Sequence, residues 1–278
     1  MIESFQDWCI NPDKETLVMG IVNVTPDSFS DGGKFYSTKD AIAHASKLIC
    51  EGADIIDIGG ESTRPGANEI SSSDELKRVI PVIKGIRSNN PDILISIDTT
   101  KAIVAKEAVE VGANIINDVS GLSFDSQMPM TVASLNVPII IMHMKGNPRN
   151  MQKNPEYKDL IDEILNYFKE RIKIATKAGI DREMIILDPG IGFGKTVEHN
   201  FQILSKLNKF NKLELPLLIG PSRKSFIGLT LNLSPEDRVD GTAATVALGV
   251  NNGARIVRVH DVEKMKRVVT ITERIRKA

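Results

Sequence analysis

The chain has little material for covalent crosslinks. Its 278 residues contain two cysteines, Cys9 and Cys50. Small proteins that depend on disulfides carry more cysteines than this and fold in oxidising compartments. We therefore expect two reduced thiols and a cytoplasmic protein.

The sequence also lacks an excess of either charge and any long apolar run. Its 35 basic and 36 acidic residues are mixed along the chain, for a formal net charge of -1. Nucleic-acid-binding domains usually carry a basic stripe, and a membrane helix needs about 20 apolar residues. The acidic N-terminus has no apolar segment of the kind found in signal peptides. We expect small-molecule partners, and neither nucleic acid nor a membrane.

Short apolar segments recur along the chain, each followed by a loop and a helical pattern. Apolar strands that alternate with helices are typical of a parallel sheet covered on both faces. Eight such units predict a (β/α)₈ TIM barrel that forms a single α/β domain over residues 1–278. The alternative, an open doubly wound sheet, is disfavoured because no GxGxxG motif follows the first strand. The predicted strands are 17–23, 53–58, 93–98, 113–117, 138–143, 184–188, 215–220 and 255–260.

Glycines separate several helical patterns from the strands that follow them. Gly52, Gly112 and Gly253 each precede an alanine at the start of such a strand. Glycine at this position permits the left-handed backbone conformation that ends many helices. We expect a helix to end at each of these three positions.

Nearly every predicted strand ends on a polar or charged side chain. In a barrel these ends converge on one mouth, where active sites of this fold are built. An isolated Asn or Asp could instead cap the next helix, and Asp98 is one example. Capping does not explain the whole set, which comprises Asn23, Asp57, Asp98, Asn117, His143, Asp188, the loop from Ser222 to Lys224, Arg258 and His260.

Arg258 and His260 share one face of the last predicted strand. Side chains alternate along a strand, so Val257 and Val259 face the other way. A buried guanidinium needs an anion, and the strand itself contains no acid. We predict that the anion is a ligand; the alternatives are a structural ion pair or an arginine at a solvated sheet edge.

The other histidines have simpler interpretations. His44 lies within a helical pattern and His199 follows a loop, so we expect structural roles for both. His143 has no other His or Cys placed to join it at a metal site. We also consider a local ion pair between Glu61 and Arg64.

The polar strand ends indicate two half-sites. Strands one and eight are neighbours in a closed barrel, so Asn23, Arg258 and His260 should lie together and bind a phosphate or pyrophosphate. The amide oxygen of Asn23 could hold Mg²⁺. Across the mouth, two carboxylates and an amide match the N–H and carbonyl edge of a heteroaromatic base, and a lysine adds a cation. The residues of this second half-site are Asp98, Asn117, Asp188 and Lys224.

Six motifs occur in the order found in the dihydropteroate synthase family. The resemblance begins near Met19, extends to the C-terminus and shows no departure at a motif position. The motifs are VNVTPDSFSDGG at 22–33, GGESTRPG at 59–66, NDVSG at 117–121, DPG at 188–190, SRKS at 222–225 and RVHD at 258–261.

This resemblance implies a transferase of folate biosynthesis. Such an enzyme joins p-aminobenzoate to (7,8-dihydropterin-6-yl)methyl diphosphate and releases pyrophosphate and 7,8-dihydropteroate. We expect a dissociative substitution with a carbocation-like intermediate. The resemblance further implies a Mg²⁺ cofactor, inhibition by sulfonamides and a homodimer. Because the chain ends soon after its eighth strand, we expect a monofunctional enzyme.

The resemblance also assigns roles to residues. Asn23 would hold Mg²⁺, Arg258 and His260 would grip the diphosphate, and Asp31 would act from the first loop. The pterin ring would be bound by Asp98, Asn117, Asp188 and Lys224. The p-aminobenzoate site would be shaped by Phe29, Thr63, Arg64, Pro65, Phe193, Lys224 and Ser225. The implied catalytic residues are Asp31, Thr63, Arg64, Lys224, Arg258 and His260.

Two alternative functions fit parts of this pattern. A methyltetrahydrofolate:corrinoid methyltransferase resembles this group in its barrel and pterin pocket, but the SRKS loop and the Arg258/His260 pair argue against it. A non-catalytic paralogue that binds pterin would be expected to lose loop residues. Asp31 and Arg64 are both present.

Overall fold

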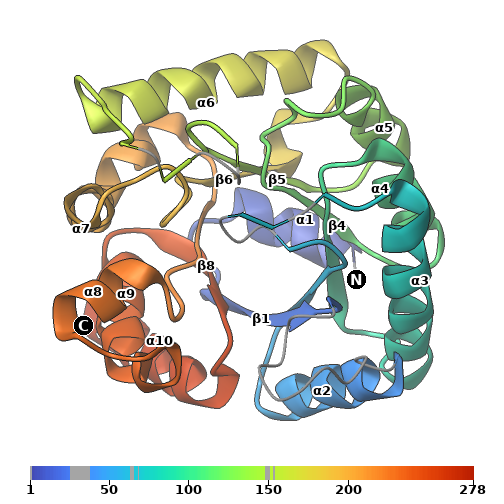
Figure 1. The fold of residues 1–278 in the computed structure, drawn as a ribbon, viewed down its shortest axis with the longest axis horizontal. Helices are drawn as coiled ribbons and strands as arrows, with labels where there is room; N and C mark the ends of the chain where they lie inside the picture. Colours follow the sequence, from blue (N-terminus) through green and yellow to red (C-terminus); the bar gives the residue numbers. More distant parts are fainter. Residues whose placement is uncertain (1, 26–37, 63–65, 68, 148–150, 153) are drawn as a thin grey trace.

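Parallel strands form a closed barrel in the structure, which is a computed structural model (Figure 1). It describes the chain apart from residues 1, 26–37, 63–65, 68, 148–150 and 153. The strands pair in chain order and β1 also pairs with β8, which confirms the predicted (β/α)₈ barrel. The strands are β1 (Leu17–Asn23), β2 (Ile55–Gly59), β3 (Leu94–Asp98), β4 (Ile115–Asp118), β5 (Ile139–Met142), β6 (Ile185–Asp188), β7 (Leu217–Ile219) and β8 (Ala254–Val259).

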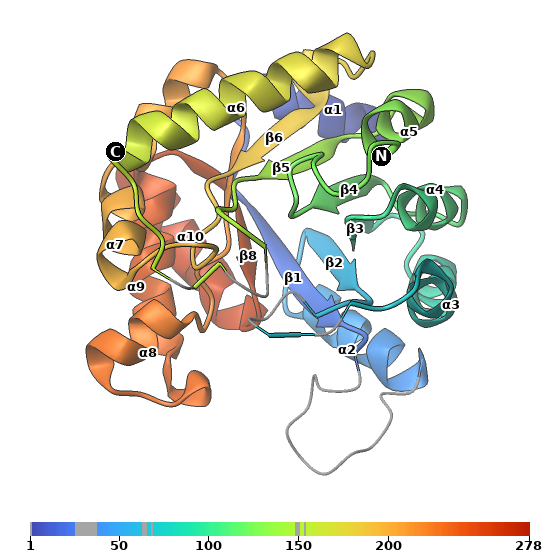
Figure 2. The ribbon, with the colours of Figure 1, turned by 45° about the horizontal axis from the view of Figure 1, so that its top comes forward.

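Helices surround the barrel (Figure 2). None of those that the structure describes is long and apolar enough to cross a membrane. The α-helices are α1 (Ile2–Ile10), α2 (Thr38–Cys50), α3 (Ser72–Asn89), α4 (Ala102–Glu110), α5 (Met128–Leu135), α6 (Leu160–Lys177), α7 (Val197–Ser205), α8 (Ser225–Leu231), α9 (Val239–Asn251) and α10 (Val262–Arg276). Short 3-10 turns are η1 (Arg182–Met184), η2 (Leu207–Leu213) and η3 (Pro235–Asp237).

The apolar side chains of the strands divide between two cores. Val18 and Ile56 belong to the larger core, which the helices cover. Met19, Ile55 and Ile115 belong to a smaller core inside the barrel. The division follows from the alternation of side chains along each strand. It explains why the strands read as continuous apolar runs.

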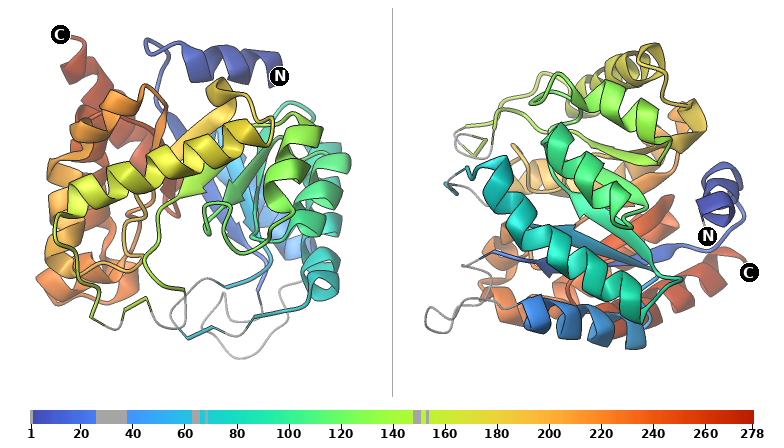
Figure 3. Two further views of the ribbon diagram at one scale, coloured as in Figure 1. Left: turned by 90° about the horizontal axis from the view of Figure 1, so that it is seen from above. Right: turned by 90° about the vertical axis from the view of Figure 1, so that its right-hand side faces the viewer.

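Helix α1 covers one end of the barrel (Figure 3). Its Phe5, Trp8 and Cys9 pack with Met19 and Ile256 in the inner core. Burial raises the pKa of the Cys9 thiol to about 12, so this cysteine is an inert apolar residue. A ligand must therefore reach the barrel from the opposite end, at the carboxyl ends of the strands.

The three predicted glycine turns are confirmed. Gly52, Gly112 and Gly253 have φ angles of 100°, 120° and 107°. A side chain is disfavoured in this left-handed region, so glycine is the residue that can turn the chain there. A strand begins within three residues of each turn.

Candidate functional site

Polar side chains gather inside the barrel at the carboxyl ends of the strands. Asp57 on β2 is the register partner of Ser96, and Asp98 on β3 is the partner of Asn117 on β4. On the other side, Asp188 on β6 is the partner of Met142. Hydrogen bonds and ion pairs connect several of these groups, as described below.

Arg258 lies at the centre of this group. Its Nε donates to Asp57 Oδ2 at 2.6 Å, and one terminal nitrogen donates to Asp98 Oδ2 at 2.9 Å. Asn117 Nδ2 also lies 3.3 Å from Asp57 Oδ2. Arg258 therefore forms a structural ion pair, which was the alternative to the predicted ligand anion. The anions are two carboxylates from β2 and β3, strands far from Arg258 in sequence.

Burial changes the protonation of the two carboxyl groups expected to bind the pterin. It raises the pKa of Asp98 to about 7, although Arg258 acts in the opposite direction. It raises the pKa of Asp188 to about 6, while the Gly190 N–H, which donates to Asp188 Oδ1 at 2.7 Å, and Lys224 lower it. Asp188 is thus ionised at neutral pH and can accept hydrogen bonds from ring N–H groups.

Lys224 approaches the site from the loop after β7. Its Nζ lies 4.1 Å from the centre of the Phe193 ring. Burial lowers the pKa of Lys224 to about 8; Arg258 lowers it further and Asp188 raises it. Ser225 follows at the start of α8 and is exposed. The structure therefore brings Phe193 and Lys224 together, with Ser225 next to them in the chain.

His260 lies just beyond the end of β8. Its Nδ1 is 3.0 Å from Ser222 Oγ. Burial lowers the pKa of His260 to about 3, and the neighbouring cations Arg258 and Arg223 contribute in the same direction. The imidazole is therefore neutral and can donate a hydrogen bond from only one of its nitrogens.

Asn23 lies at the mouth but not level with Arg258. β1 pairs with β8 as predicted, yet the stagger of the barrel places Met19 beside Arg258. A Cβ added to Gly59 would lie 3.7 Å from both Asn23 Oδ1 and Asp98 Oδ2. Gly59 thus leaves space next to two hard oxygen atoms. Mg²⁺ prefers oxygen ligands and often keeps waters and substrate phosphates among them, so Asn23 Oδ1 is chemically suited to such an ion, whereas Asp98 Oδ2 already accepts from Arg258.

Comparison with known proteins identifies the family. The model of the pterin binding enzyme family matches residues 19–260. A dihydropteroate synthase of Bacillus subtilis is 51% identical over 260 residues, which cover 94% of this chain and 88% of the relative. The chain belongs to the dihydropteroate synthase family of pterin-binding enzymes.

Solved structures of dihydropteroate synthases have the same fold. The Yersinia pestis enzyme, in complex with a sulfonamide drug, has a TM-score of 0.92 at 44% identity and covers 96% of both chains. The Xanthomonas albilineans enzyme with 4-aminobenzoic acid has a TM-score of 0.89 at 43% identity, over 96% of this chain and 95% of the other. The same enzyme with 7,8-dihydropteroate has a TM-score of 0.86 at 40% identity, over 96% of both chains.

Part of the predicted dihydropteroate synthase site lies outside the described residues. It comprises Phe29 and Asp31 in the sequence between β1 and α2, and Thr63, Arg64 and Pro65 in the sequence between β2 and α3. Their roles stay predictions.

Two residues of the site were missed by sequence reasoning. Asp57 ends a predicted strand but received no role, and the structure pairs it with Arg258. Lys195 is 3% exposed, and its Nζ lies 2.9 Å from the Phe193 carbonyl oxygen and 3.0 Å from His143 Nδ1. Burial lowers the pKa of Lys195 to about 7. The sequence feature that could have pointed to Lys195 is its position directly after the glycine-rich loop 190–194.

Glu61 forms an ion pair with Lys101. Lys101 forms ion pairs with Glu61 and with Glu75, which is fully buried at the start of α3. The other Glu61 oxygen accepts a hydrogen bond from the Ile70 N–H at 3.1 Å. Glu61 thus links the end of β2 to the segments before α3 and α4. Arg64 lies outside the described residues.

His199 and His143 are held in structural contacts. His199 forms a capping box with Thr196 at the start of α7, which confirms its structural role. His143 packs edge-on against Tyr167 at 4.8 Å, and burial lowers its pKa to about 2. No cluster of three or more potential metal-binding side chains occurs among His, Cys, Asp and Glu in the described ranges.

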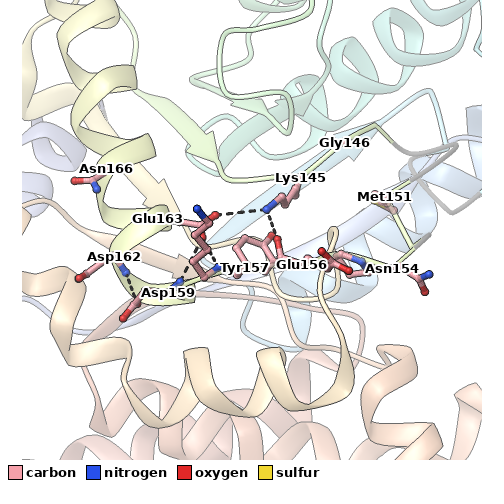
Figure 4. A pocket seen from close by; sticks show the side chains of 12 residues that line it. Lys145, Gly146, Met151, Asn154, Glu156, Tyr157, Asp159, Asp162, Glu163 and Asn166 are labelled. Atoms are coloured by element: carbon pink, nitrogen blue, oxygen red, sulfur yellow. Dashed lines mark hydrogen bonds and ion pairs between the residues drawn. The ribbon is translucent and has the colours of Figure 1, made fainter.

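A cavity of about 990 Å³ lies between the loop after β5 and the start of α6 (Figure 4). None of the predicted site residues lines it. Lys145 pairs with Glu163 at 3.4 Å and lies 4.1 Å above the Tyr157 ring, and Asp159 caps α6. The polar groups that line the cavity mostly contact one another, so we assign no ligand to this cavity.

Proposed function

We propose that this chain condenses p-aminobenzoate with (7,8-dihydropterin-6-yl)methyl diphosphate to form 7,8-dihydropteroate and pyrophosphate. The proposal rests on one observation above all: carboxylates, amides and cations meet at a single barrel mouth in a chain of this family. The Xanthomonas albilineans relative, solved separately with 4-aminobenzoic acid and with 7,8-dihydropteroate, supports the choice of substrates.

The pterin ring would bind deep in the mouth. Asp188 would accept hydrogen bonds from ring N–H groups, and Asn117 and Asp98 would contact the same edge. Lys224 would donate to a ring nitrogen or carbonyl oxygen. The rings of Phe193 and of p-aminobenzoate are flat and apolar, so stacking near Lys224 is favourable.

The diphosphate would bind between β8 and β1. Arg258 offers a guanidinium suited to bidentate contact with phosphate, and neutral His260 offers one N–H. Asn23 would hold Mg²⁺ together with the diphosphate. Mg²⁺, when bound, supplies positive charge that stabilises the departing pyrophosphate.

The chemistry we propose is dissociative. The C–O bond to the diphosphate breaks, and its electron pair leaves with the phosphate oxygen. The electron-rich pterin delocalises the positive charge of the methylene carbon, while Arg258 and His260 stabilise the leaving group. The arylamine nitrogen then forms the C–N bond and releases its proton. Because an arylamine is a modest nucleophile, excluding water matters more than a general base.

Asp31 provides a test of the first loop. Asp31→Ala should lower kcat by at least about tenfold and leave pterin affinity nearly unchanged, because the role proposed for Asp31 is in turnover and the pterin contacts are assigned to other residues. Steady-state kinetics and pterin titration would measure both, with the exposed Asp13→Ala as control. An unchanged kcat would remove Asp31 from the mechanism.

Pyrophosphate release tests the function itself. The assay uses the pterin diphosphate and Mg²⁺, with and without p-aminobenzoate, together with identification of the product. Release that accompanies dihydropteroate formation and stops on chelation would support both the reaction and the metal. Binding without turnover would contradict the proposal and indicate a non-catalytic pterin-binding protein.

We also propose a homodimer in the cytoplasm. Large apolar side chains are exposed on three neighbouring helices: Phe201 on α7, Leu229 and Leu231 on α8, and Leu248 on α9. Contiguous exposed apolar surface is typical of protein interfaces, and a second copy of the chain would cover it. Cys9 and Cys50 are free thiols, as is usual in a reducing compartment.

A further inference from the structure

Ser222 makes two contacts with His260. The backbone N–H of His260 donates to Ser222 Oγ at 3.1 Å, and the same Oγ lies 3.0 Å from His260 Nδ1. Ser222 is 4% exposed. Among the described residues, no other side chain has a hydrogen bond to the His260 ring. Ser222 is therefore the hydrogen-bond partner on the Nδ1 side of this imidazole.

The two contacts determine where the protons lie. Ser222 Oγ accepts from a backbone N–H, so its own hydrogen must find another acceptor. His260 Nδ1 is the acceptor within reach among the described residues. The opposite arrangement, with Nδ1 as donor, would leave the buried Ser222 hydroxyl hydrogen unpaired, which costs free energy. A neutral ring that accepts at Nδ1 carries its proton on Nε2.

The groups around the ring favour its neutral form. Arg258, Arg223 and Lys224 lower the pKa of His260, as burial does, while Asp261 raises it. Nε2–H is then the single N–H that the ring offers to a ligand.

The backbone around Ser222 is held in place from several sides. Arg223 has a φ of 56°, a left-handed conformation that needs support in a residue with a side chain. Its guanidinium forms a bidentate pair with Asp261, at 3.0 and 2.7 Å. Its N–H donates to Thr242 Oγ1 at 3.1 Å, and Arg238 donates to its carbonyl oxygen at 2.9 Å. Asp261 directly follows His260, so the Arg223–Asp261 pair joins the two loops that carry Ser222 and His260.

We propose that Ser222 is a positioning residue that holds His260 in the Nε2–H tautomer, so that this N–H donates to the diphosphate of the substrate. The inference rests on the proposed function and extends it to a residue outside the predicted substrate contacts. A preorganised donor of this kind needs no reorientation as charge develops on the leaving group.

The tautomer can be measured directly in the protein without substrate. Long-range ¹⁵N–¹H spectra distinguish protonated from unprotonated ring nitrogens, and His260→Gln identifies the signals among the four histidines of the chain. We expect a neutral His260 with its proton on Nε2 in the wild type and in Ser222→Thr. Ser222→Ala should show exchange between tautomers or a mixture. A proton on Nδ1 in the wild type, or an unchanged spectrum in Ser222→Ala, would overturn the proposal.

Binding of inorganic pyrophosphate in the presence of Mg²⁺ supplies the second readout. Ser222→Ala should weaken this binding and raise KM for the pterin diphosphate by about five- to tenfold, with KM for p-aminobenzoate unchanged. Ser222→Thr should restore both, and Ser205→Ala, a hydroxyl deletion on the exposed surface of α7, should change neither.

A double-mutant cycle separates positioning from direct contact. If Ser222 acts through His260, Ser222→Ala adds no loss to His260→Gln. Additive losses would show that Ser222 contacts the ligand itself and would overturn the proposal. The spectra and pyrophosphate titrations need no turnover, so a failure of the proposed reaction would be visible separately, as absent dihydropteroate.

Discussion

Arg258 shows how this site accommodates a buried charge. Asp57 and Asp98 supply its counter-charges, and Asn117 donates to Asp57. A buried ion pair stabilises little by itself, but removal of one partner leaves an uncompensated charge at a cost of several kcal/mol. The carboxylates thus keep Arg258 in place at the mouth, where the diphosphate is expected to bind.

Asp188 provides a residue-scale test of the pterin site. Asp188→Asn should weaken pterin binding by about 1 to 3 kcal/mol, because ring N–H groups would face a poorer acceptor. Calorimetric titration with a pterin that lacks the diphosphate would measure the loss, and the exposed Asp162→Asn is a matched control. Wild-type affinity in Asp188→Asn would place the pterin elsewhere.

Asp188 and Lys224 predict the pH dependence of pterin binding. The pKa of Asp188 is raised to about 6 by burial, so its carboxylate is lost as the pH falls below that value. The pKa of Lys224 is lowered to about 8 by burial, so its positive charge is lost as the pH rises above that value. Asp98, whose pKa burial raises to about 7, would lose its charge on the acid side as well, so pterin affinity should fall below about pH 7 and again above about pH 8.

Titration of pterin binding across this range would test that expectation. Lys224→Arg should move the alkaline limb to higher pH, because an arginine stays charged there. An affinity that stays constant through both limbs would contradict the assignment of Asp188 and Lys224.

At the scale of elements, α1 closes the end of the barrel opposite the site. Trp8 stacks on Phe5 with ring centres 5.3 Å apart, and the Arg255 guanidinium lies 4.2 Å from the Trp8 ring. Trp8 Nε1 donates to the Glu15 carbonyl oxygen at 2.8 Å. These contacts join α1 to the start of β8 and close the end opposite the site.

Trp8→Ala should lower the free energy of unfolding by about 3 to 5 kcal/mol, the usual cost of removing a large buried aromatic side chain. Urea denaturation would measure this loss in the free energy of unfolding. Ile10 on the same helix is 55% exposed, and Ile10→Ala should change stability by no more than about 0.5 kcal/mol. Equal effects of the two substitutions would show that α1 does not close the barrel as described.

At the scale of the whole molecule, the exposed apolar side chains on α7 to α9 predict self-association. Replacement of Leu229 and Leu248 together by glutamate should shift the protein from dimer to monomer, because burying two carboxylates at an interface is unfavourable. Sedimentation velocity would measure the shift, with Ile103→Glu on α4 as the exposed control. A dimer that survives the double substitution must use another surface.

Local pattern alone predicted most of the architecture. Each strand lies within about two residues of its predicted position, because continuous apolar segments between helical patterns are what a doubly covered parallel strand requires. Alternation along the chain also placed Ile256 and Arg258 on the inner face, away from Val257 and Val259. These features depend on neighbours in sequence, so the sequence contains them.

Contacts between side chains on different strands of the barrel could not be predicted from these local patterns. The register and stagger of the strands decide that Arg258 meets Asp57 and Asp98, and that Asn23 lies further toward the mouth than Arg258. Side-chain geometry decides that Lys101 reaches Glu61.

The sequence by itself determined the barrel, its polar mouth and the family. The tertiary structure alone decided which charges neutralise one another and that Ser222 faces the His260 ring, because those contacts join residues that are distant in the chain. Their distances depend on how the sheet closes, and burial inside the closed barrel sets their pKa values.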